Sequence, residues 1–564
     1  MQAGETTLNK LLNTTRQFIV PIFQRHYSWH FQQYEQLWID ILRAGNFSEG
    51  QNHFMGSIVY MDLGTPAGRP QQLLLIDGQQ RLTTISILIH ALKSYIQSKA
   101  ISMDLINIAK LDNQFLYNRD ELNDDKYKLI LNERDKDTYI RLLDGDLLTL
   151  RNPSRRIVDC YNYFWGKIDE HFKLTANLDD IYVGILNLNV VSISLTKNID
   201  NPQLIFESMN STGKDLSQID LLRNYLLMDS VPEEQNRLYE IYWKPLESLF
   251  FDEADFISFI RDYLTIKRDG QICKIKDVYE VFKRYTVNNH ILREDLLKDL
   301  YRYAIFYANM DLLKEVDEEL KLYWQELKFF EIKSVYPFFL QLYCTYSNQK
   351  INKADFIFAI KLTINYLCRR AICGIPTNSL SKIFANLYKK IDFNSYRNSL
   401  IKAYIYEPDY RRFPSDYEVR ECLQTKDMYH FYLKYYILLK IENCQHKELI
   451  DLSARQYTVE HILPQNIDKN PSWQAILGAN WQEVHALYVN TLGNLTLTGY
   501  NSEMGNKSFE YKVHSSIGFA KSHLKINRMI AEYSVWNKQS IQWRTNKLTD
   551  VLLKLWEYPN LCYK

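Results

Sequence analysis

One short stretch constrains the fold of this chain more than any other. Residues 73–76, Leu-Leu-Leu-Ile, form an apolar run that predicts a buried strand. From Leu82 to Ile96, apolar residues recur at steps of three and four, which predicts an amphipathic helix. Asp77 to Arg81 therefore make a turn from a strand into a helix.

Two interpretations of this turn stand side by side. Free backbone N–H groups and the dipole at a helix N-terminus favour an anion, and Arg81 adds a guanidinium fork suited to phosphate. Alternatively, Asp77 and Gln80 form a pair resembling a capping box, and Gly78 only eases the turn. From the turn alone we favour the structural interpretation, because short motifs often match by chance.

Further strands before the turn indicate an α/β unit at the N-terminus. Residues 5–17 predict a short helix, and residues 18–23 and 54–60 each predict a strand. Gln24 and Arg25 follow the first of these strands directly. A surface ion pair is the more common role for such an arginine.

The long central part of the chain carries less chemistry. Residues 190–195 alternate as a strand, and two helices follow, joined by a turn that Asn210 and Asp220 flank. Helix capping is the simpler role for these two polar residues. Residues 231–440 predict aromatic-rich helices without an exact repeat, to which we assign no chemistry.

Composition excludes several classes of protein. A length of 564 residues indicates several domains, and a formal net charge of +1 gives no global attraction to nucleic acid or membrane. The eight cysteines form no CxxC pair, which argues against zinc and against a disulfide framework. Neither a signal-peptide pattern nor an apolar run of bilayer length is present. We expect a soluble, reduced, cytoplasmic protein with no membrane partner.

A second chemical stretch lies near the C-terminus. Residues 457–461 predict a strand that ends on a Glu-His pair, a second strand begins about thirty residues later, and residues 507–512 predict a helix. This order of strand, strand and helix, with polar residues at the junctions, fits a ββα-metal site. In chain order the polar residues are Glu460, His461, Asn494, Asn501 and Asn506.

These residue types suit the hydrolysis of a phosphodiester. A neutral His461 can act as the general base, and an asparagine amide can hold its imidazole in one orientation. A hard cation such as Mg²⁺ prefers oxygen ligands, which Glu460 and an asparagine carbonyl supply, and it stabilises the developing charge. A structural histidine is the favoured interpretation for His461 alone. For the ordered set it becomes the minority interpretation.

Both stretches together resemble GmrSD-type restriction proteins. The N-terminal resemblance rests on residues 18–21, Gln24, Arg25, Tyr27, Trp29, residues 54–58 and residues 77–84. A second N-terminal signature comprises Phe206, Asn210, Gly213, Leu216, Asp220 and Leu221. The C-terminal resemblance rests on residues 460–464, residues 493–495, Asn501 and residues 506–509.

The resemblance implies a ParB-like N-terminal domain that binds and hydrolyses a nucleoside triphosphate. GTP, ATP and CTP stay open as the nucleotide. No GxxxxGK[ST] motif is present, so such an NTPase relies on the turn after the buried strand. The residues implied at the nucleotide site are Gln24, Arg25, Asp77, Gly78, Gln79, Gln80 and Arg81.

At the other end, the resemblance implies an HNH (His-Me finger) nuclease domain. His461 is implied as the general base and Asn494 as its orienting partner. Glu460, with Asn501 or Asn506, is implied to bind Mg²⁺ or Mn²⁺. The expected fold is α+β and multidomain, with a ParB-like α/β domain over residues 1–230, an all-helical middle over 231–440 and the ββα-metal nuclease over 441–564.

The function expected from these features is an NTP-regulated, metal-dependent DNA endonuclease. It would sense modified phage or plasmid DNA and act as a restriction factor in anti-phage defence. Homo-oligomerisation is left open. Two alternatives stand beside this function: a non-catalytic module that senses a nucleotide or DNA, and an RNA-cutting toxin of abortive infection.

Overall fold

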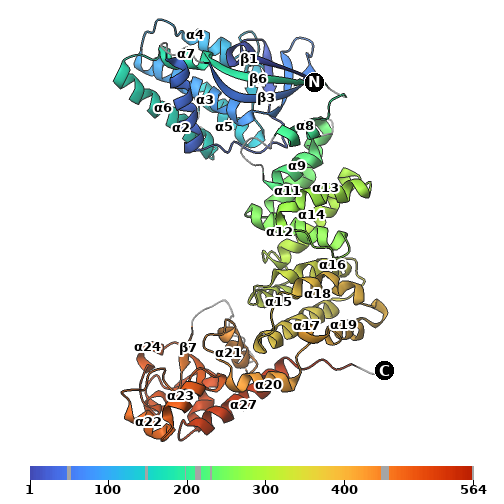
Figure 1. Ribbon diagram of the computed structural model, residues 1–564, viewed down its shortest axis with the longest axis vertical. Helices are drawn as coiled ribbons and strands as arrows, with labels where there is room; N and C mark the ends of the chain where they lie inside the picture. Colours follow the sequence, from blue (N-terminus) through green and yellow to red (C-terminus); the bar gives the residue numbers. More distant parts are fainter. Residues whose placement is uncertain are drawn as a thin grey trace. The chain divides into compact units, whose positions relative to one another are not determined.

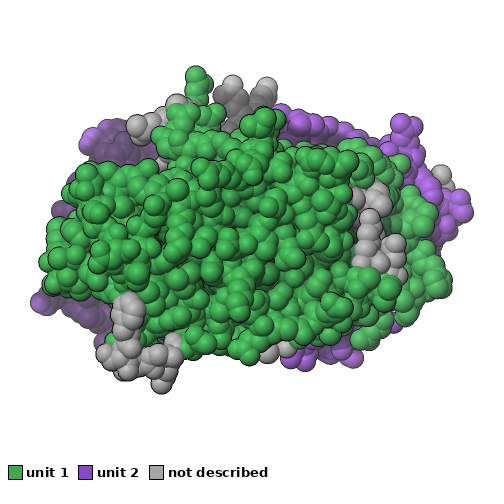
Figure 2. All heavy atoms as spheres, turned by 90° about the horizontal axis from the view of Figure 1, so that it is seen from above, with its two compact units in different colours: residues 1–248, 278–301 green, residues 249–277, 302–564 purple. Residues whose placement is uncertain are grey.

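The computed structural model describes residues 1–46, 52–146, 150–196, 199–209, 217–228, 232–445 and 457–561. The contacts between residues divide the chain into two compact units (Figures 1 and 2). Unit 1 comprises residues 1–248 and 278–301, and unit 2 comprises residues 249–277 and 302–564. The chain is mixed α/β, with a sheet in unit 1 and a two-stranded ribbon in unit 2.

A six-stranded mixed sheet organises unit 1. Its strand order is β1-β6-β3-β4-β2-β5, and β4 lies between β3, its antiparallel partner, and β2, its parallel partner. The predicted buried strand is thus confirmed at an inner position of the sheet, with Leu75 and Ile76 fully buried. The strands are β1 Gln2–Thr7, β2 Arg16–Ile19, β3 His53–Gly64, β4 Gln71–Asp77, β5 Leu129–Ile130 and β6 Leu188–Leu195.

Two details near the N-terminus differ from the prediction. The predicted helix over residues 5–17 is only α1, Leu8–Leu12, because the residues before it form β1 and pair with β6. Thr7 ends that strand and caps the helix by accepting a hydrogen bond from the Lys10 backbone. β2 ends at Ile19, since Pro21 has no N–H to continue the ladder.

Helices cover the sheet of unit 1 (Figure 1). α2 (Phe31–Gly45) and α7 (Asp179–Leu186) approach each other closely at two glycines. A Cβ atom at Gly45 would lie 2.0 Å from the Asp180 carbonyl oxygen, and one at Gly184 would lie 2.1 Å from the carbonyl oxygen of Ile41. Only glycine permits this backbone contact. The other helices up to residue 209 are α3 Gln79–Lys99, α4 Ile108–Leu111, α5 Glu133–Asp144, α6 Arg155–Thr175 and α8 Pro202–Met209.

The middle of the chain is helical, as the sequence predicts. Described residues 232–445 contain helices and no strand. None of the described helices has the length and apolar character needed to cross a bilayer. The longer helices are α9 Gln218–Leu227, α12 Glu253–Lys267, α13 Val278–Asn288, α14 Arg293–Met310, α15 Glu318–Lys328, α16 Tyr336–Ser347, α17 Lys353–Ile372, α19 Tyr396–Ile405, α20 Asp416–Thr425 and α21 Lys434–Asn443.

The C-terminal part of unit 2 contains the predicted pair of strands and the helix after them. β7 (Thr458–His461) pairs antiparallel with β8 (Leu495–Thr498), so that His461 lies opposite Leu495. A Cβ atom at Gly493 would lie 2.2 Å from the Ile541 carbonyl oxygen, so the start of β8 packs directly on α27. The helices here are α22 Pro471–Leu477, α23 Trp481–Tyr488, α24 Asn501–Met504, α25 Phe509–His514, α26 Lys525–Arg528 and α27 Lys538–Leu555.

Candidate functional site

His461 ends β7 in a buried, aromatic environment. Its side chain is 6% exposed, and its ring centroid lies 4.3 Å from that of Tyr429. Burial, reinforced by the positive charges of Lys512 and Lys434, lowers the pKa of His461 to about 4. The imidazole is therefore neutral at physiological pH, the state that a general base requires.

A short chain of hydrogen bonds fixes the tautomer of this imidazole. Asn490 Nδ2 donates to Asp427 Oδ2 at 3.1 Å, so the amide oxygen of Asn490 faces the other way, toward His461. His461 Nε2 lies 3.0 Å from that oxygen and must donate its proton to it. The lone pair of the neutral ring is then on Nδ1, and Nδ1 is the atom that can accept a proton.

Asn494, the residue predicted to orient His461, lies next to the turn after β7 rather than on the imidazole. Its Oδ1 accepts the Leu463 backbone N–H at 2.7 Å, and its Nδ2 donates to the Leu463 carbonyl at 2.9 Å. Trp536 Nε1 donates to the same Oδ1 at 3.0 Å, and the side chain is fully buried. Asn494 therefore fixes the backbone that follows His461, whereas Asn490 contacts its ring.

Glu460, the predicted metal ligand, is paired with a buried lysine. Lys512 Nζ donates to Glu460 Oε1 at 2.6 Å and to the His461 carbonyl oxygen at 2.6 Å. The exposed fractions are 0% for Lys512 and 4% for Glu460. Burial raises the pKa of Glu460, and the adjacent ammonium group opposes that shift. The pair joins β7 to α25.

The two other predicted metal ligands lie at different places. Asn501 begins α24 and donates its Nδ2 to the Val459 carbonyl at 3.0 Å, one residue from Glu460 in β7. The carbonyl of Asn506 instead accepts a hydrogen bond from Asn470, at the start of α22, and the Asn506 side chain is exposed. The geometry favours Asn501 over Asn506 as a neighbour of Glu460.

A divalent ion fits this donor set only with help from the substrate. Within the described ranges, no group of three or more His, Cys, Asp and Glu side chains is placed to hold a metal. Mg²⁺ is commonly held by one or two carboxylates together with water and substrate phosphate. Glu460 offers one carboxylate, of which Oε1 already accepts from Lys512, and Asn501 offers an amide oxygen from a side chain held at Val459, one residue away in β7.

The predicted nucleotide residues come together at the end of β4. Gln24 Nε2 donates to the Ile76 carbonyl at 2.8 Å, and Gln79 Nε2 donates to the Arg25 carbonyl at 3.2 Å. The Ser28 backbone N–H donates to Gln80 Oε1 at 2.8 Å. These three glutamines are buried and join the loop after β2 to the turn before α3. Their amides bond to the protein backbone, so these side chains mainly hold the loop and the turn in place.

The charged predicted residues are more open. Asp77 and Arg81 form an ion pair at 3.7 Å, and their side chains are 26% and 25% exposed. Gly78, with a φ of 94°, is the N-cap of α3. Because it has no side chain, it cannot cap the first N–H groups of that helix, which have no intrahelical partners. Among the described residues, no side-chain or backbone acceptor binds the Arg25 guanidinium. A cation and free N–H groups are thus available for an anion.

A glycine in β3 makes room for Arg81. Gly56 has a φ of 114°, and a Cβ atom there would lie 3.0 Å from Arg81 Cζ. Arg81 NH1 also donates to the Ser57 carbonyl at 2.6 Å. The guanidinium is therefore held against the bulged part of β3, where the glycine leaves room for it.

The second N-terminal signature is described only in part. Asn210, Gly213 and Leu216 lie outside the described residues. Asp220 is buried near the start of α9, where its backbone N–H is capped by Ser217, and it pairs with Arg223 at 3.3 Å. This contact agrees with a structural role for Asp220.

Sequence reasoning missed four residues of the C-terminal site. Asn490 and Tyr429 contact the His461 ring, and Asp427 holds Asn490, but the three come from segments after helix ends that carry no recognisable motif. Lys512 had a signal, since it stands in the predicted helix among apolar positions. A lysine on the buried side of a short helix indicates a buried acidic partner.

Both ends of the chain match models of one known protein family. Residues 8–227 match the family model "GmrSD restriction endonuclease, N-terminal domain", and residues 413–551 match "GmrSD restriction endonucleases, C-terminal domain". An uncharacterized protein of Methanocaldococcus jannaschii is 25% identical over 234 residues, which are 36% of this chain and 38% of that protein. An uncharacterized protein of Spiroplasma virus SpV1-R8A2 B is 26% identical over 155 residues, 24% of this chain and 22% of that protein. The matches thus span less than two fifths of either relative, whereas both family domains occur here in order: the chain belongs to the GmrSD restriction endonuclease family.

Proposed function

We propose that this protein is an NTP-regulated, metal-dependent DNA endonuclease that restricts modified phage or plasmid DNA. The observation that carries the proposal is the neutral His461 at the end of β7, with Nε2 bound to Asn490 and Nδ1 left to accept a proton. Membership in a restriction endonuclease family supports DNA as the substrate.

In this proposal the C-terminal site is of the HNH type, and each residue has a separate task. His461 Nδ1 removes a proton from the attacking water. Asn490 and Asp427 keep the ring in the required tautomer and orientation. Asn494 acts one step away, since it holds the backbone of Leu463 and thereby the end of β7.

Glu460, with Asn501 or Asn506, would hold Mg²⁺ or Mn²⁺, which when bound supplies positive charge for the departing oxygen. Lys512 would fix the Glu460 carboxylate in place, and its charge opposes the rise in the Glu460 pKa that burial causes. Because Lys512 already pairs with Glu460, a DNA phosphate would supply further negative charge for the ion.

We further propose that the N-terminal domain is ParB-like and binds a nucleoside triphosphate. The phosphates would bind the N-terminus of α3, with Arg25 and Arg81 as cationic partners and Asp77 beside them. The three buried glutamines, Gln24, Gln79 and Gln80, would hold the loop and turn in position. Hydrolysis of GTP, ATP or CTP would then regulate the nuclease.

Cleavage of modified and unmodified phage DNA, with and without each triphosphate, tests this function. Divalent-ion-dependent cutting should be lost in His461→Ala and retained in His514→Ala, an exposed histidine of the same domain. Asp77→Ala and Arg81→Ala should each lose triphosphate hydrolysis. Equal cutting by His461→Ala and wild type would remove the nuclease assignment, and unchanged hydrolysis in both N-terminal variants would remove the nucleotide site.

The same experiment separates the alternatives. DNA binding without cleavage under every condition would indicate a non-catalytic sensor. Faster cleavage of RNA than of any DNA would indicate an RNA-cutting toxin.

A further inference from the structure

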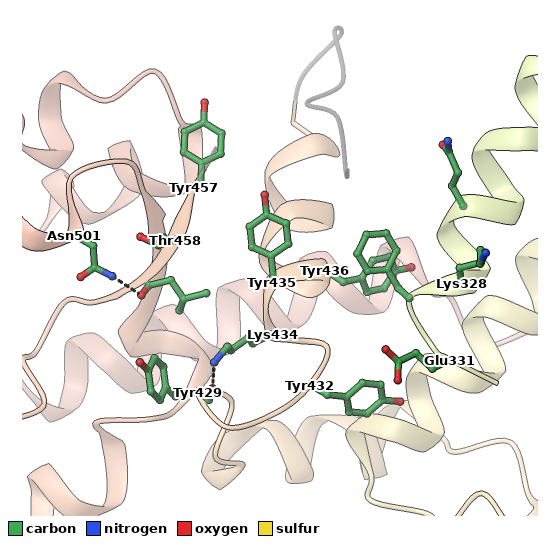
Figure 3. Close-up of a pocket in the computed structure, with 13 residues that line it drawn as sticks. Lys328, Glu331, Tyr429, Tyr432, Lys434, Tyr435, Tyr436, Tyr457, Thr458 and Asn501 are labelled. Carbon is green, nitrogen blue, oxygen red and sulfur yellow. Dashed lines mark hydrogen bonds between the residues drawn. The ribbon is translucent and has the colours of Figure 1, made fainter. Parts of the chain in front are cut away.

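A pocket rich in tyrosine lies beside the strand that carries His461. Its volume is about 660 Å³, which is within the range of about 300–1,000 Å³ typical of ligand sites. Residues from the end of α15 face the segment around Tyr432 and Tyr435 across the pocket, and Thr458 and Asn501 lie on the β7 side (Figure 3). All of these residues belong to unit 2.

The pocket and the candidate nuclease site share a wall. Tyr429 lines the pocket, and its ring also packs on the His461 imidazole. Thr458 and Val459 line the pocket directly before Glu460 and His461 in β7. A nucleotide next to a DNA phosphodiester bound at His461 would therefore lie close to this pocket.

The aromatic side chains of the pocket suit a flat, apolar ligand. Tyr432 is 58% exposed, although it is a large side chain within a concave surface. Tyr435 and Tyr457 line the same space, and the Tyr457 hydroxyl is held by His523 at 2.7 Å. A nucleobase stacks on such rings whatever its identity, because every base has a π-face.

Cationic and anionic groups in the pocket add polarity at separate places. Lys434 Nζ lies 4.3 Å from the ring centroid of Tyr429, on the side of the nuclease site, where a backbone phosphate would pass. Glu331 and Gln325 come from the other wall. Glu331 accepts no hydrogen bond from any described residue, and its carboxylate is free to accept one from a base.

The backbone at Glu331 allows a substitution that removes the side chain without strain. Glu331 lies three residues after the end of α15 and has a φ of 53°, in the left-handed region that favours glycine. Its backbone N–H donates to the Lys328 carbonyl at 3.1 Å, as in a helix C-terminus of the usual kind. The carboxylate makes no contact with a described residue that holds this turn, and a glycine is compatible with its backbone.

We propose that this pocket takes one unpaired base of the DNA substrate, swung out of the duplex next to the bond that is cut. Tyr432 would stack on the base, and Glu331 would accept a hydrogen bond from the exocyclic amino group of cytosine or adenine. The proposal rests on the DNA endonuclease function proposed above and names the substrate feature that the site reads.

Binding of dye-labelled duplexes to the full-length His461→Ala protein tests the pocket without cleavage. One duplex is fully paired, and the others carry a single unpaired cytosine, adenine or thymine. We expect unpaired cytosine and adenine to bind more tightly than the paired duplex. Tyr432→Ala should weaken this binding about ten-fold, whereas Tyr432→Phe, which keeps the ring, and Tyr417→Ala, at a 72% exposed tyrosine outside the pocket, should not.

Glu331→Gly gives an independent test, because glycine adopts the left-handed φ of this position without strain. We expect no loss of thermal stability, together with loss of the preference for unpaired cytosine and adenine over thymine. Equal affinity for paired and unpaired duplexes would overturn the proposal. So would an affinity for the unpaired-base duplexes that is the same in Tyr432→Ala as in the parent protein. Cleavage by the parent protein is measured separately: cutting that needs His461 but not Tyr432 refutes the pocket alone, and tight binding through Tyr432 without any cutting refutes the nuclease alone.

Discussion

Lys512 Nζ lies 2.6 Å from Glu460 Oε1 in a site from which water is almost excluded, and the same ammonium group binds the carbonyl oxygen of His461. One cation thus fixes both the side chain of the predicted metal ligand and the backbone of the predicted base. A buried pair of this kind gives little net stability over an apolar pair, but breaking it leaves a charge without a partner.

Lys512→Met should therefore destabilise the C-terminal part of unit 2 by about 3–5 kcal/mol. The double variant Glu460→Gln/Lys512→Met should recover most of that loss, because no buried charge is left. Hydrogen exchange of peptides from β7 and α25 measures both. If the single and double variants exchange equally fast, the ion pair does not hold these elements together.

Asn490→Ala tests the contact on the imidazole. The side chain is only half-buried, so the fold should stay intact, but the ring loses the acceptor that fixes its tautomer. We expect kcat to fall roughly 10- to 100-fold, part of the effect of a general base. Asn480→Ala, at an exposed asparagine whose side chain makes no capping bond, is the matched control and should cut normally. Normal kcat in Asn490→Ala would show that the ring needs no such partner.

Asn494→Ala should act differently, through the backbone. It removes two acceptor contacts and two donor contacts from a fully buried position and leaves the Trp536 N–H and the Leu463 N–H without partners. Unpaired buried groups cost about 1–3 kcal/mol each, so we expect both a lower melting temperature and lower activity. Activity lost without any change in melting temperature would instead indicate direct contact with the reacting groups.

Gly56→Ala tests whether the space beside Arg81 matters for the nucleotide. An added methyl group would push against the Arg81 guanidinium, which it approaches to 3.0 Å, and triphosphate affinity should fall. Gly64→Ala is the matched control, since Gly64 has a φ of 94° in the same strand but no atom within 4 Å of the added Cβ. Both variants bear the same kind of backbone strain. Equal loss of affinity in the two would assign the effect to strain rather than to Arg81.

Local patterns in the sequence predict the elements that carry the sites. The apolar run at residues 73–76, the helix from Leu82 and the strand that ends on His461 are all confirmed, because period and turn chemistry are local properties. β1 and β5 escape prediction: β5 has only two residues, β1 has no apolar alternation, and the two exist through pairing of β1 with β6 and of β5 with β2. Their stability comes from partners that are distant in the sequence.

The candidate sites divide in the same way. Residues on the predicted strands and turns could be named in advance, such as His461 and Arg81. Their partners Asn490, Asp427 and Lys512 come from segments that only the folded chain brings near. Asn494 illustrates the limit: its place after β7 follows from the order of the strands, but which atoms it contacts depends on side-chain packing against Trp536.

Acid should loosen α3 through His90, a buried residue of the helix that begins at the candidate nucleotide site. Burial, together with the charge of Lys93, lowers the pKa of His90 to about 4. In the unfolded chain a histidine titrates near 6.5, so the unfolded state binds more protons between these two values. Stability is complete above about pH 6.5 and falls as the pH drops toward 4, by about 3 kcal/mol at most. His90→Gln, which cannot titrate, should flatten this slope in hydrogen exchange of α3 peptides corrected for intrinsic rates, and the exposed control His514→Gln should keep it. An identical acid slope in His90→Gln and wild type would assign the acid sensitivity of α3 to another group.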